Sequence, residues 1–272
     1  MNLDEPERSR DPRRETEPVP SGLTASTEKQ DQMQKFGVAW DAEEVAFPPL
    51  ADPNTKRAIW RARKMFAEII HDVTVLEGNP FTLPEIQTLL DGVTVGGRKV
   101  SDAEQVLNQK NAFLHLFGLV ETGAFSLNPK IACDLQRLAA HGEALEEGVF
   151  RSGKVSISGA TYEPPAGEGL ASMLEARFSR MAMEAETLEN HFEKGMVAFL
   201  HVARSQCFWD GNKRTGRLLM NGVLLAAGQD IITIPAAKQL EFNQTMLRFY
   251  ETGIGTEMMN FLSKSQIRNK FE

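Results

Sequence analysis

Residues 206–217, which read QCFWDGNKRTGR, bring together the residue types that bind phosphate groups. The hydrophobic pattern around them predicts a helix that ends near Ser205, then a tight loop over Asp210-Gly211-Asn212, then a second helix. Gly211 lets the backbone pass close to a ligand, and a helix N-terminus presents free N–H groups and positive potential. The loop is therefore a candidate anion site.

Three cations begin the second helix, at Lys213, Arg214 and Arg217. Arg214 and Arg217 are three residues apart and share one helix face, so the two guanidiniums are spaced to clamp a polyphosphate. Asp210 is a candidate ligand for Mg²⁺ that bridges such phosphates. Taken by themselves, these residues also fit a basic first turn that is solvated or salt-bridged.

Composition narrows the class of protein. The chain has 272 residues, 42% of them hydrophobic and 25% charged, with a net charge of −7. The acidic balance argues against sequence-independent binding of nucleic acid, and no apolar run is long enough for a membrane span. Cys133 and Cys207 lie far apart, so neither a disulfide framework nor a zinc site is expected. These features predict a cytoplasmic globular protein.

The elements that must position residues 206–217 are mainly helices. Residues 1–35 are rich in charge and proline and predict a disordered tail. Apolar residues at spacings of three and four predict one continuous helix from Asn54 to Leu76. Thr82 to Glu85 and Ser101 to Glu104 read as capping boxes, and Asn128-Pro129 as a helix start. Further helical periodicity covers residues 170–181, 196–200, 218–224, 236–250 and 257–262.

One segment has strand-like periodicity. Residues 154–158 and 161–163 read as two short strands about a Gly159 turn, and Pro164-Pro165 ends them. The expected architecture is therefore mainly α, an orthogonal helical bundle that carries one β-hairpin.

The segment FWDGNKRTGR resembles the signature of Fic (Fido) proteins, which runs His-Pro-Phe-x-Asp/Glu-Gly-Asn-Gly/Lys-Arg-x-x-Arg. The hairpin lies where the family has its flap, and Leu76-Glu77-Gly78-Asn79 is similar to the end of an N-terminal inhibitory helix. The resemblance implies a tail at 1–35 and an N-terminal helical region at 36–130 with an inhibitory helix at 55–77. It implies a Fic core at 131–266 with a flap at 154–163 and a signature at 206–217.

Members of the family typically transfer AMP from ATP to a target hydroxyl, so the resemblance implies ATP and Mg²⁺ as cofactors. It implies that Asp210 binds the magnesium ion and that Gly211, Asn212, Lys213, Arg214, Gly216 and Arg217 form the nucleotide site, with Asn212 on the α-phosphate. The flap residues Ser156, Ile157, Ser158, Thr161 and Tyr162 would dock an unknown target protein by strand addition. Neither nucleic acid nor membrane is expected as a partner, and self-association is allowed.

Gln206 departs from the signature, because the family has its catalytic histidine there and a proline where this chain has Cys207. Glutamine has no site that titrates near neutrality, so it cannot serve as a general base. Three hypotheses follow: Gln206 only orients the hydroxyl and transfer is slow, another residue is the base, or the protein binds nucleotide without turnover. His201 is nearest in sequence but is expected in the core or behind the site.

Two more positions bear on the function. Lys213 replaces the glycine of many AMP-transferring members and is also seen in Doc relatives, which phosphorylate their targets; Arg217 argues against that kinase function. Glu77 is implied to pair with Arg217 and block the γ-phosphate. The usual Ser or Thr four residues earlier is Val73 here, and an ordinary surface glutamate is the alternative.

Overall fold

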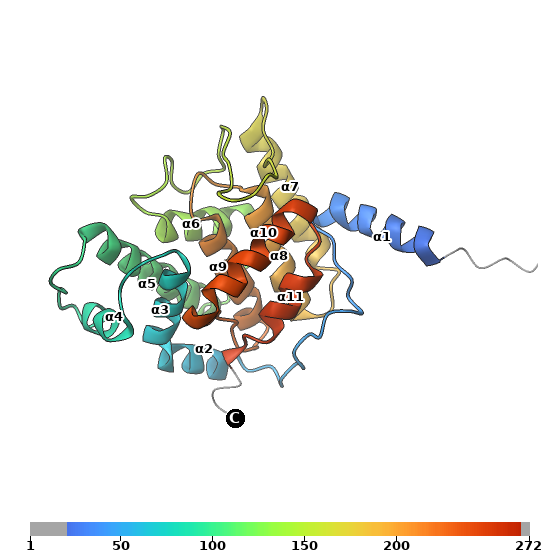
Figure 1. The fold of residues 1–272 in the computed structure, drawn as a ribbon. Coiled ribbons are helices and arrows are strands. Elements are labelled where there is room, and N and C mark those ends of the chain that lie inside the picture. The colour runs from blue at the N-terminus through green and yellow to red at the C-terminus, as the bar shows by residue number, and fades with distance from the viewer. Residues whose placement is uncertain (1–20, 268–272) are drawn as a thin grey trace, which may run out of the picture.

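Two helices at the centre of the molecule, α8 (His191–Ser205) and α9 (Asn212–Ala226), flank the signature loop (Figure 1). Their backbones approach closely because glycines face the partner helix. A Cβ on Gly195 would lie 3.0 Å from the Met220 carbonyl oxygen, and one on Gly216 would lie 2.9 Å from the Phe199 ring. Every residue of α9 except Lys213 and Ala226 is buried. This pair fixes the position of the loop between Ser205 and Asn212.

The computed structural model describes residues 21–267, with side chains from residue 27. That range forms eleven α-helices and one short 3-10 helix. The elements outside α8 and α9 are α1 (Ser21–Phe36), α2 (Thr55–Lys64), α3 (Phe66–Leu76), α4 (Leu83–Leu90), α5 (Val100–Glu121), α6 (Pro129–Ala139), α7 (Leu170–Ala185), η1 (Ala236–Lys238), α10 (Gln239–Thr252) and α11 (Thr256–Ser263).

The mainly helical fold is confirmed, and the local start signals lie where the sequence indicated. The Asn128 side chain accepts a hydrogen bond of 2.9 Å from the backbone N–H of Ile131 at the start of α6. The Glu85 carboxylate accepts one of 2.8 Å from the backbone N–H of Thr82 before α4. Such caps satisfy the free N–H groups of a first helical turn.

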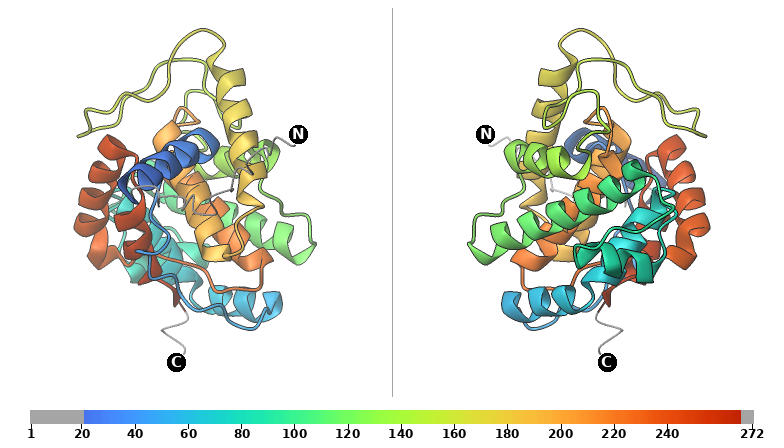
Figure 2. Two further views of the ribbon diagram at one scale, coloured as in Figure 1. Left: turned by 90° about the vertical axis from the view of Figure 1, so that its right-hand side faces the viewer. Right: turned by 90° about the vertical axis from the view of Figure 1, so that its left-hand side faces the viewer.

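The predicted tail at 1–35 is wrong for residues 21–35, because these belong to α1; residues 1–20 lie outside the described residues. Helix α1 projects beside α7 and packs against it (Figures 1 and 2). An ion pair of 2.7 Å joins Lys35 to Asp31 along the helix, and Phe36 is buried at its end. This packing on α7 is a tertiary contact that composition alone does not reveal.

The single helix predicted over 55–77 is two helices. Met65 interrupts it with φ −105° and ψ 21°, although Met65 still donates to the Arg61 carbonyl and Ile69 to the Met65 carbonyl. Helix α3 then ends at Leu76, and Glu77 is its C-cap residue. A one-residue break leaves the spacing of apolar residues almost unchanged, so the periodicity did not reveal it.

The β-hairpin is also wrong for the described chain, in which the only β pairings are two isolated bridges, Ala39 with Ile254 and Ile232 with Gln266. Residues 154–163 form an extended loop with a turn at Ser158-Gly159. The loop rests on α10, because Glu251 accepts hydrogen bonds of 2.5 Å from both the backbone N–H and the hydroxyl of Thr161. A lone hairpin has no further strand to pair with, and this docking replaces its ladder.

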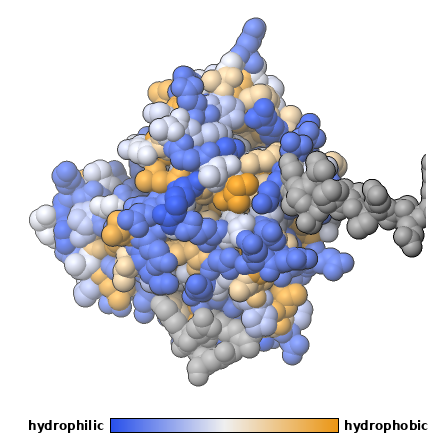
Figure 3. Space-filling model, turned by 45° about the vertical axis from the view of Figure 1, so that its right-hand side comes forward, coloured by the Kyte–Doolittle hydropathy of each residue, from blue (hydrophilic) through white to orange (hydrophobic). Residues whose placement is uncertain are grey.

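The regions predicted at 36–130 and 131–266 share one continuous hydrophobic core. Helix α5 packs on α3, α6 and α9, which brings the end of α3 next to the start of α9. No helix within residues 21–267 is both long and apolar enough to cross a bilayer. The face shown in Figure 3 is largely hydrophilic, and its hydrophobic residues form small separate patches.

Candidate nucleotide site

A cavity of about 530 Å³ opens beside the signature loop. The extended loop closes one side with residues 155–158, and α10 closes another with Asn243, Met246, Leu247 and Tyr250. Gln206, Trp209 and residues 210–213 form its floor, and Glu77 reaches it from the end of α3. Segments far apart in the sequence therefore meet around the candidate anion site.

Glu77 pairs with two cations of the first turn of α9. Its carboxylate lies 2.8 Å from Arg217 Nη2 and 3.5 Å from Lys213 Nζ, and its side chain is only 15% exposed. Burial by itself would raise the pKa of Glu77, but the charges of Arg217, Lys213 and Arg214 outweigh it and hold the pKa at about 2. The structure therefore pairs Glu77 with Arg217 and adds Lys213 as a further partner.

Arg217 keeps unused hydrogen-bonding capacity. Its side chain is 5% exposed and lies under the Phe242 ring at 5.8 Å, and neither its Nε nor its Nη1 has a partner among the described residues. Buried donors without acceptors are costly. An anion that displaced the Glu77 carboxylate would supply acceptors for these N–H groups.

Arg214 is held differently from Arg217. Its Nη1 donates to the Ala139 carbonyl at 2.8 Å and to Glu143 at 2.6 Å, and its Nη2 lies 3.3 Å from Asp210 Oδ1. Neither Arg214 nor Arg217 lines the cavity itself. Each of the two arginines that the sequence predicted as phosphate ligands is therefore paired with a carboxylate.

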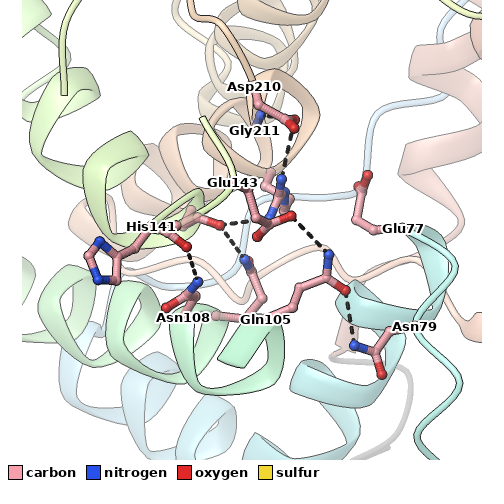
Figure 4. Close-up of polar contacts among 12 residues, drawn as sticks. Glu77, Asn79, Gln105, Asn108, His141, Glu143, Asp210 and Gly211 are labelled. Atoms are coloured by element: carbon pink, nitrogen blue, oxygen red, sulfur yellow. Dashed lines mark hydrogen bonds and ion pairs between the residues drawn. The ribbon is translucent and has the colours of Figure 1, made fainter. Parts of the chain in front are cut away.

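Figure 4 shows a chain of polar contacts that leads from the segment after α3 to the first turn of α9. Asn79 donates to Gln105 at 3.0 Å, Gln105 donates to Glu143 at 3.1 Å, and Glu143 binds Arg214. The segment after α3 thus contacts Arg217 directly through Glu77 and is linked to Arg214 through three side chains.

Gln206 is tied at both ends of its amide. It lies in the left-handed region with φ 47°, donates from Nε2 to the Ala203 carbonyl at 2.6 Å, and accepts from Asn212 Nδ2 at 3.1 Å. Asn212 also donates to the Phe208 carbonyl and accepts from the Phe208 N–H, both at 2.8 Å. The Asn212 side chain therefore shapes the loop, and the Gly211 N–H donates to Asp210 Oδ1 at 2.5 Å.

The other candidate bases near Gln206 are poorly suited. His201 is 2% exposed and lies behind the cavity, where burial lowers its pKa to about 4. Burial raises the pKa of the Cys207 thiol to about 12, although Arg151 opposes the shift. Neither residue lines the cavity, and both are buried.

Arg151, which the sequence did not single out, joins the extended loop to the signature. The side chain is fully buried and has only carbonyl partners: Gln206, at a short distance, Gly153 at 2.6 Å, Pro165 at 2.9 Å and Ser205 at 3.3 Å. Planar guanidinium donors suit this set of diverging acceptors.

Replacement of Arg151 by lysine is expected to lower the free energy of unfolding by about 1–3 kcal/mol, because an ammonium cannot reach all of these carbonyls and leaves at least one buried acceptor unpaired. Urea unfolding of the variant checks this, with the exposed Arg63→Lys as the matched control. Equal stability of the two variants would contradict the role of Arg151.

Some of the residues predicted to form the flap lie at the cavity and others do not. Ser156, Ile157 and Ser158 line it, whereas Thr161 and Tyr162 lie where the loop returns over α10 and α8. Among the described residues, none accepts a hydrogen bond from the backbone N–H of Ser156 or Ile157. That edge is available to pair with an extended segment.

Asp210 fits the magnesium ion that the family implies. Its side chain is 53% exposed at the cavity, and within residues 21–267 no three His, Cys, Asp or Glu side chains gather into a metal site. A single carboxylate is nevertheless a suitable protein donor, since Mg²⁺ is commonly bound by one or two carboxylates together with substrate phosphates.

Comparison with known proteins identifies the domain. The model of the Fic/DOC family matches residues 126–224, which include the whole signature. The chain contains a Fic/DOC domain. The solved structure of a Fic-domain protein from Bacteroides thetaiotaomicron has a TM-score of 0.66 at 19% identity, over 89% of this chain and 94% of that one. The solved structure of Fic-1 from C. elegans has a TM-score of 0.61 at 16% identity, and the match covers 90% of this chain and 71% of that one. These likenesses establish the Fic fold.

Curated relatives of the Fic/DOC domain are named protein adenylyltransferase Fic. The protein from Drosophila ananassae is 28% identical over 190 residues, which are 68% of this chain and 37% of that protein. The protein from Drosophila grimshawi is 28% identical over 210 residues, which are 75% of this chain and 42% of that protein. The chain thus spans less than half the length of these relatives.

Proposed function

We propose that this chain transfers AMP from Mg-ATP to a hydroxyl group of a protein, slowly because Gln206 replaces the base, and under restraint by Glu77. The pairing of Glu77 with Arg217 and Lys213 carries the proposal, because it puts a carboxylate where a phosphate group would bind. The similarity to proteins named protein adenylyltransferase Fic supports the same reaction.

The residues at the cavity have distinct roles in this reaction. Once Glu77 moves away, Arg217 and Lys213 hold the terminal phosphates, and the N–H groups at the start of α9 face the α-phosphate. The target oxygen bonds to the α-phosphorus while the bond to pyrophosphate breaks. Asp210 would hold Mg²⁺, which neutralises the phosphate charge. Gln206 can orient the target hydroxyl, whose proton passes to solvent.

The target segment would pair with the free backbone edge at Ser156 and Ile157. Such strand addition takes its affinity from main-chain hydrogen bonds and is compatible with many side chains. A cytoplasmic location and self-association stay predictions from the sequence.

A second function, a regulator that binds nucleotide without turning it over, is favoured by one observation. Gln206, the residue expected to meet the target hydroxyl, has no group that titrates near neutrality. Both ends of its amide are in addition hydrogen-bonded within the protein.

The first experiment uses the Glu77→Gly variant in cell lysate with Mg-ATP labelled at the α- or the γ-phosphate. We expect protein labelling from α-labelled ATP alone, and none from Glu77→Gly/Asp210→Ala, which lacks the magnesium ligand. Labelling from the γ-phosphate alone would indicate a Doc-like kinase. Absence of both labels, with calorimetric binding of Mg-ATP intact, would indicate the nucleotide-binding regulator.

A further inference from the structure

A second cavity lies on the other side of the extended loop, between α1, α7 and the last turn of α8. It has a volume of about 320 Å³ and is lined by Lys35, Arg177, Arg180, Arg204, His201 and Tyr162, among others. We call it the α7 pocket. The left view of Figure 2 shows α1 and α7 next to each other on this side of the molecule.

The α7 pocket is lined by four cations and no carboxylate. Lys35 has a partner in Asp31, at 2.7 Å. Arg204 lies 4.1 Å from the centre of the Tyr162 ring and donates from Nε to the Tyr250 carbonyl at 3.3 Å. Glu251 is near enough to interact with it electrostatically but forms no ion pair with it. Arg177 and Arg180 form no ion pair with any residue whose side chain the structure describes. Three guanidiniums therefore line one small space without an ion-paired carboxylate among the described side chains.

Helix dipoles do not account for this arrangement. Cations are stabilised in the last turn of a helix, which suits Arg204 at the end of α8. Arg177 and Arg180, however, lie in the interior of α7, which runs from Leu170 to Ala185. Like charges three residues apart on a helix destabilise it. A bound anion would offset that repulsion.

His201 adds a buried polar atom without a partner. Its Nδ1 lies 2.7 Å from the Phe36 carbonyl oxygen, which can only accept, so the proton of the neutral ring is on Nδ1. Its Nε2 is buried and has no partner in the part of the chain that the structure describes. Buried polar atoms are nearly always paired in folded proteins, so this unpaired nitrogen is a second unusual feature among the residues that line the α7 pocket.

We propose that the α7 pocket binds a small oxoanion with the chemistry of a phosphate monoester. Guanidiniums bind phosphate oxygens in pairs, and the three arginines offer such pairs from two helices. The volume is at the low end of the range of about 300–1,000 Å³ that small-molecule sites occupy, which suits a phosphoryl group rather than a whole nucleotide.

The α7 pocket is separate from the nucleotide site but shares a wall with the extended loop. Tyr162 and Pro165 line it, and Arg151 donates both to the Pro165 carbonyl and to the Ser205 carbonyl at the end of α8. An anion held by Arg177 and Arg204 would connect α7 with this end of the loop. Its binding does not depend on the function proposed for the nucleotide site.

The test is a titration of the full chain with inorganic phosphate, followed by the NMR signals of the His201 ring. We expect these signals to shift and saturate, and Arg177→Gln/Arg180→Gln to weaken the binding at least tenfold. The control Arg63→Gln/Arg248→Gln removes two charges from other helices and should bind as the unaltered protein does. A parallel titration uses N-acetyl-phosphoserine amide. Tighter binding of inorganic phosphate would indicate a site for the free anion, and tighter binding of the phosphoserine compound would indicate a site for a phosphorylated side chain.

Two results would overturn the proposal: unshifted His201 signals, or equal losses of affinity in the two double variants, which would mean a general charge effect. Phosphate that binds at the nucleotide site is recognised separately, because Arg217→Ala removes that binding and is expected to leave the His201 shifts in place. Both double variants change exposed side chains, and thermal unfolding checks that they fold.

Discussion

Replacement of Gln206 by histidine in the Glu77→Gly background is expected to raise the rate of AMP transfer about 100- to 10,000-fold, the usual contribution of a positioned general base. The position already lies at the cavity floor, between the end of α8 and the signature loop. What it lacks is a group that takes a proton near neutral pH.

The backbone at residue 206 is compatible with this change. Its φ of 47° lies in the left-handed region, which histidine tolerates better than most residues with a Cβ. The Ala203 carbonyl, which now accepts from Gln206 Nε2 at 2.6 Å, can accept from one imidazole N–H instead, and the other ring nitrogen is then free to take a proton. The substitution therefore adds a base without removing the support of the loop.

Initial rates with α-labelled ATP as a function of pH test the prediction. The Gln206→His variant should gain a limb in its pH–rate profile with an apparent pKa near that of histidine, about 6.5, which a structural improvement would not produce. Gln206→Ala is the matched control and should show neither the higher rate nor the limb. An unchanged rate for Gln206→His with intact Mg-ATP binding would mean that another feature of the site prevents turnover.

The parts of the fold that the sequence predicted are those with local causes. The start of α6 depends on Asn128 and Pro129, and the start of α4 on Thr82 and Glu85, which lie within a few residues of the groups they cap. Helix α1 and the docked loop that replaces the hairpin depend on contacts with distant segments, and the break at Met65 leaves the spacing of apolar residues almost unchanged. The docking of Thr161 on Glu251, for example, joins residues 90 positions apart.

The candidate site divides in the same way. Residues 206–217 are contiguous, so the sequence alone indicates that they can bind phosphate. The pairing of Glu77 with Arg217 was predicted from a family resemblance. Glu143 and Arg151 left no such signal. Each is a single charged residue in an irregular segment, and its role depends on carbonyl groups and side chains that only the folded chain brings near.

The acid stability of the chain should depend strongly on Glu77. Its pKa is about 2 in the folded protein, well below the 4.5 of a free glutamate, so ionised Glu77 stabilises the fold by about 3 kcal/mol above pH 5. Because the folded pKa is the lower one, this contribution is complete above the unfolded pKa and is lost as the pH falls from about 5 toward 2.

Urea unfolding of the unaltered chain and of Glu77→Gln, followed from pH 7 to pH 3, measures that contribution. Glutamine keeps an acceptor for Arg217 but carries no charge. The difference in free energy of unfolding should therefore be about 3 kcal/mol at pH 7 and clearly smaller at pH 3. A difference that does not change with pH would show that Glu77 acts through its shape and hydrogen bonds rather than its charge.

The low pKa of Glu77 also limits how the restraint that we propose for it can be released. Between pH 5 and pH 8 Glu77 stays ionised beside Arg217 and Lys213, so mild acidification should not activate AMP transfer in the unaltered chain. Release then requires the end of α3 to move away from α9, against contacts that include the chain from Asn79 through Gln105 to Glu143. A partner that binds α3 or α4 in the displaced position would favour it, because such a partner has differential affinity for the two states.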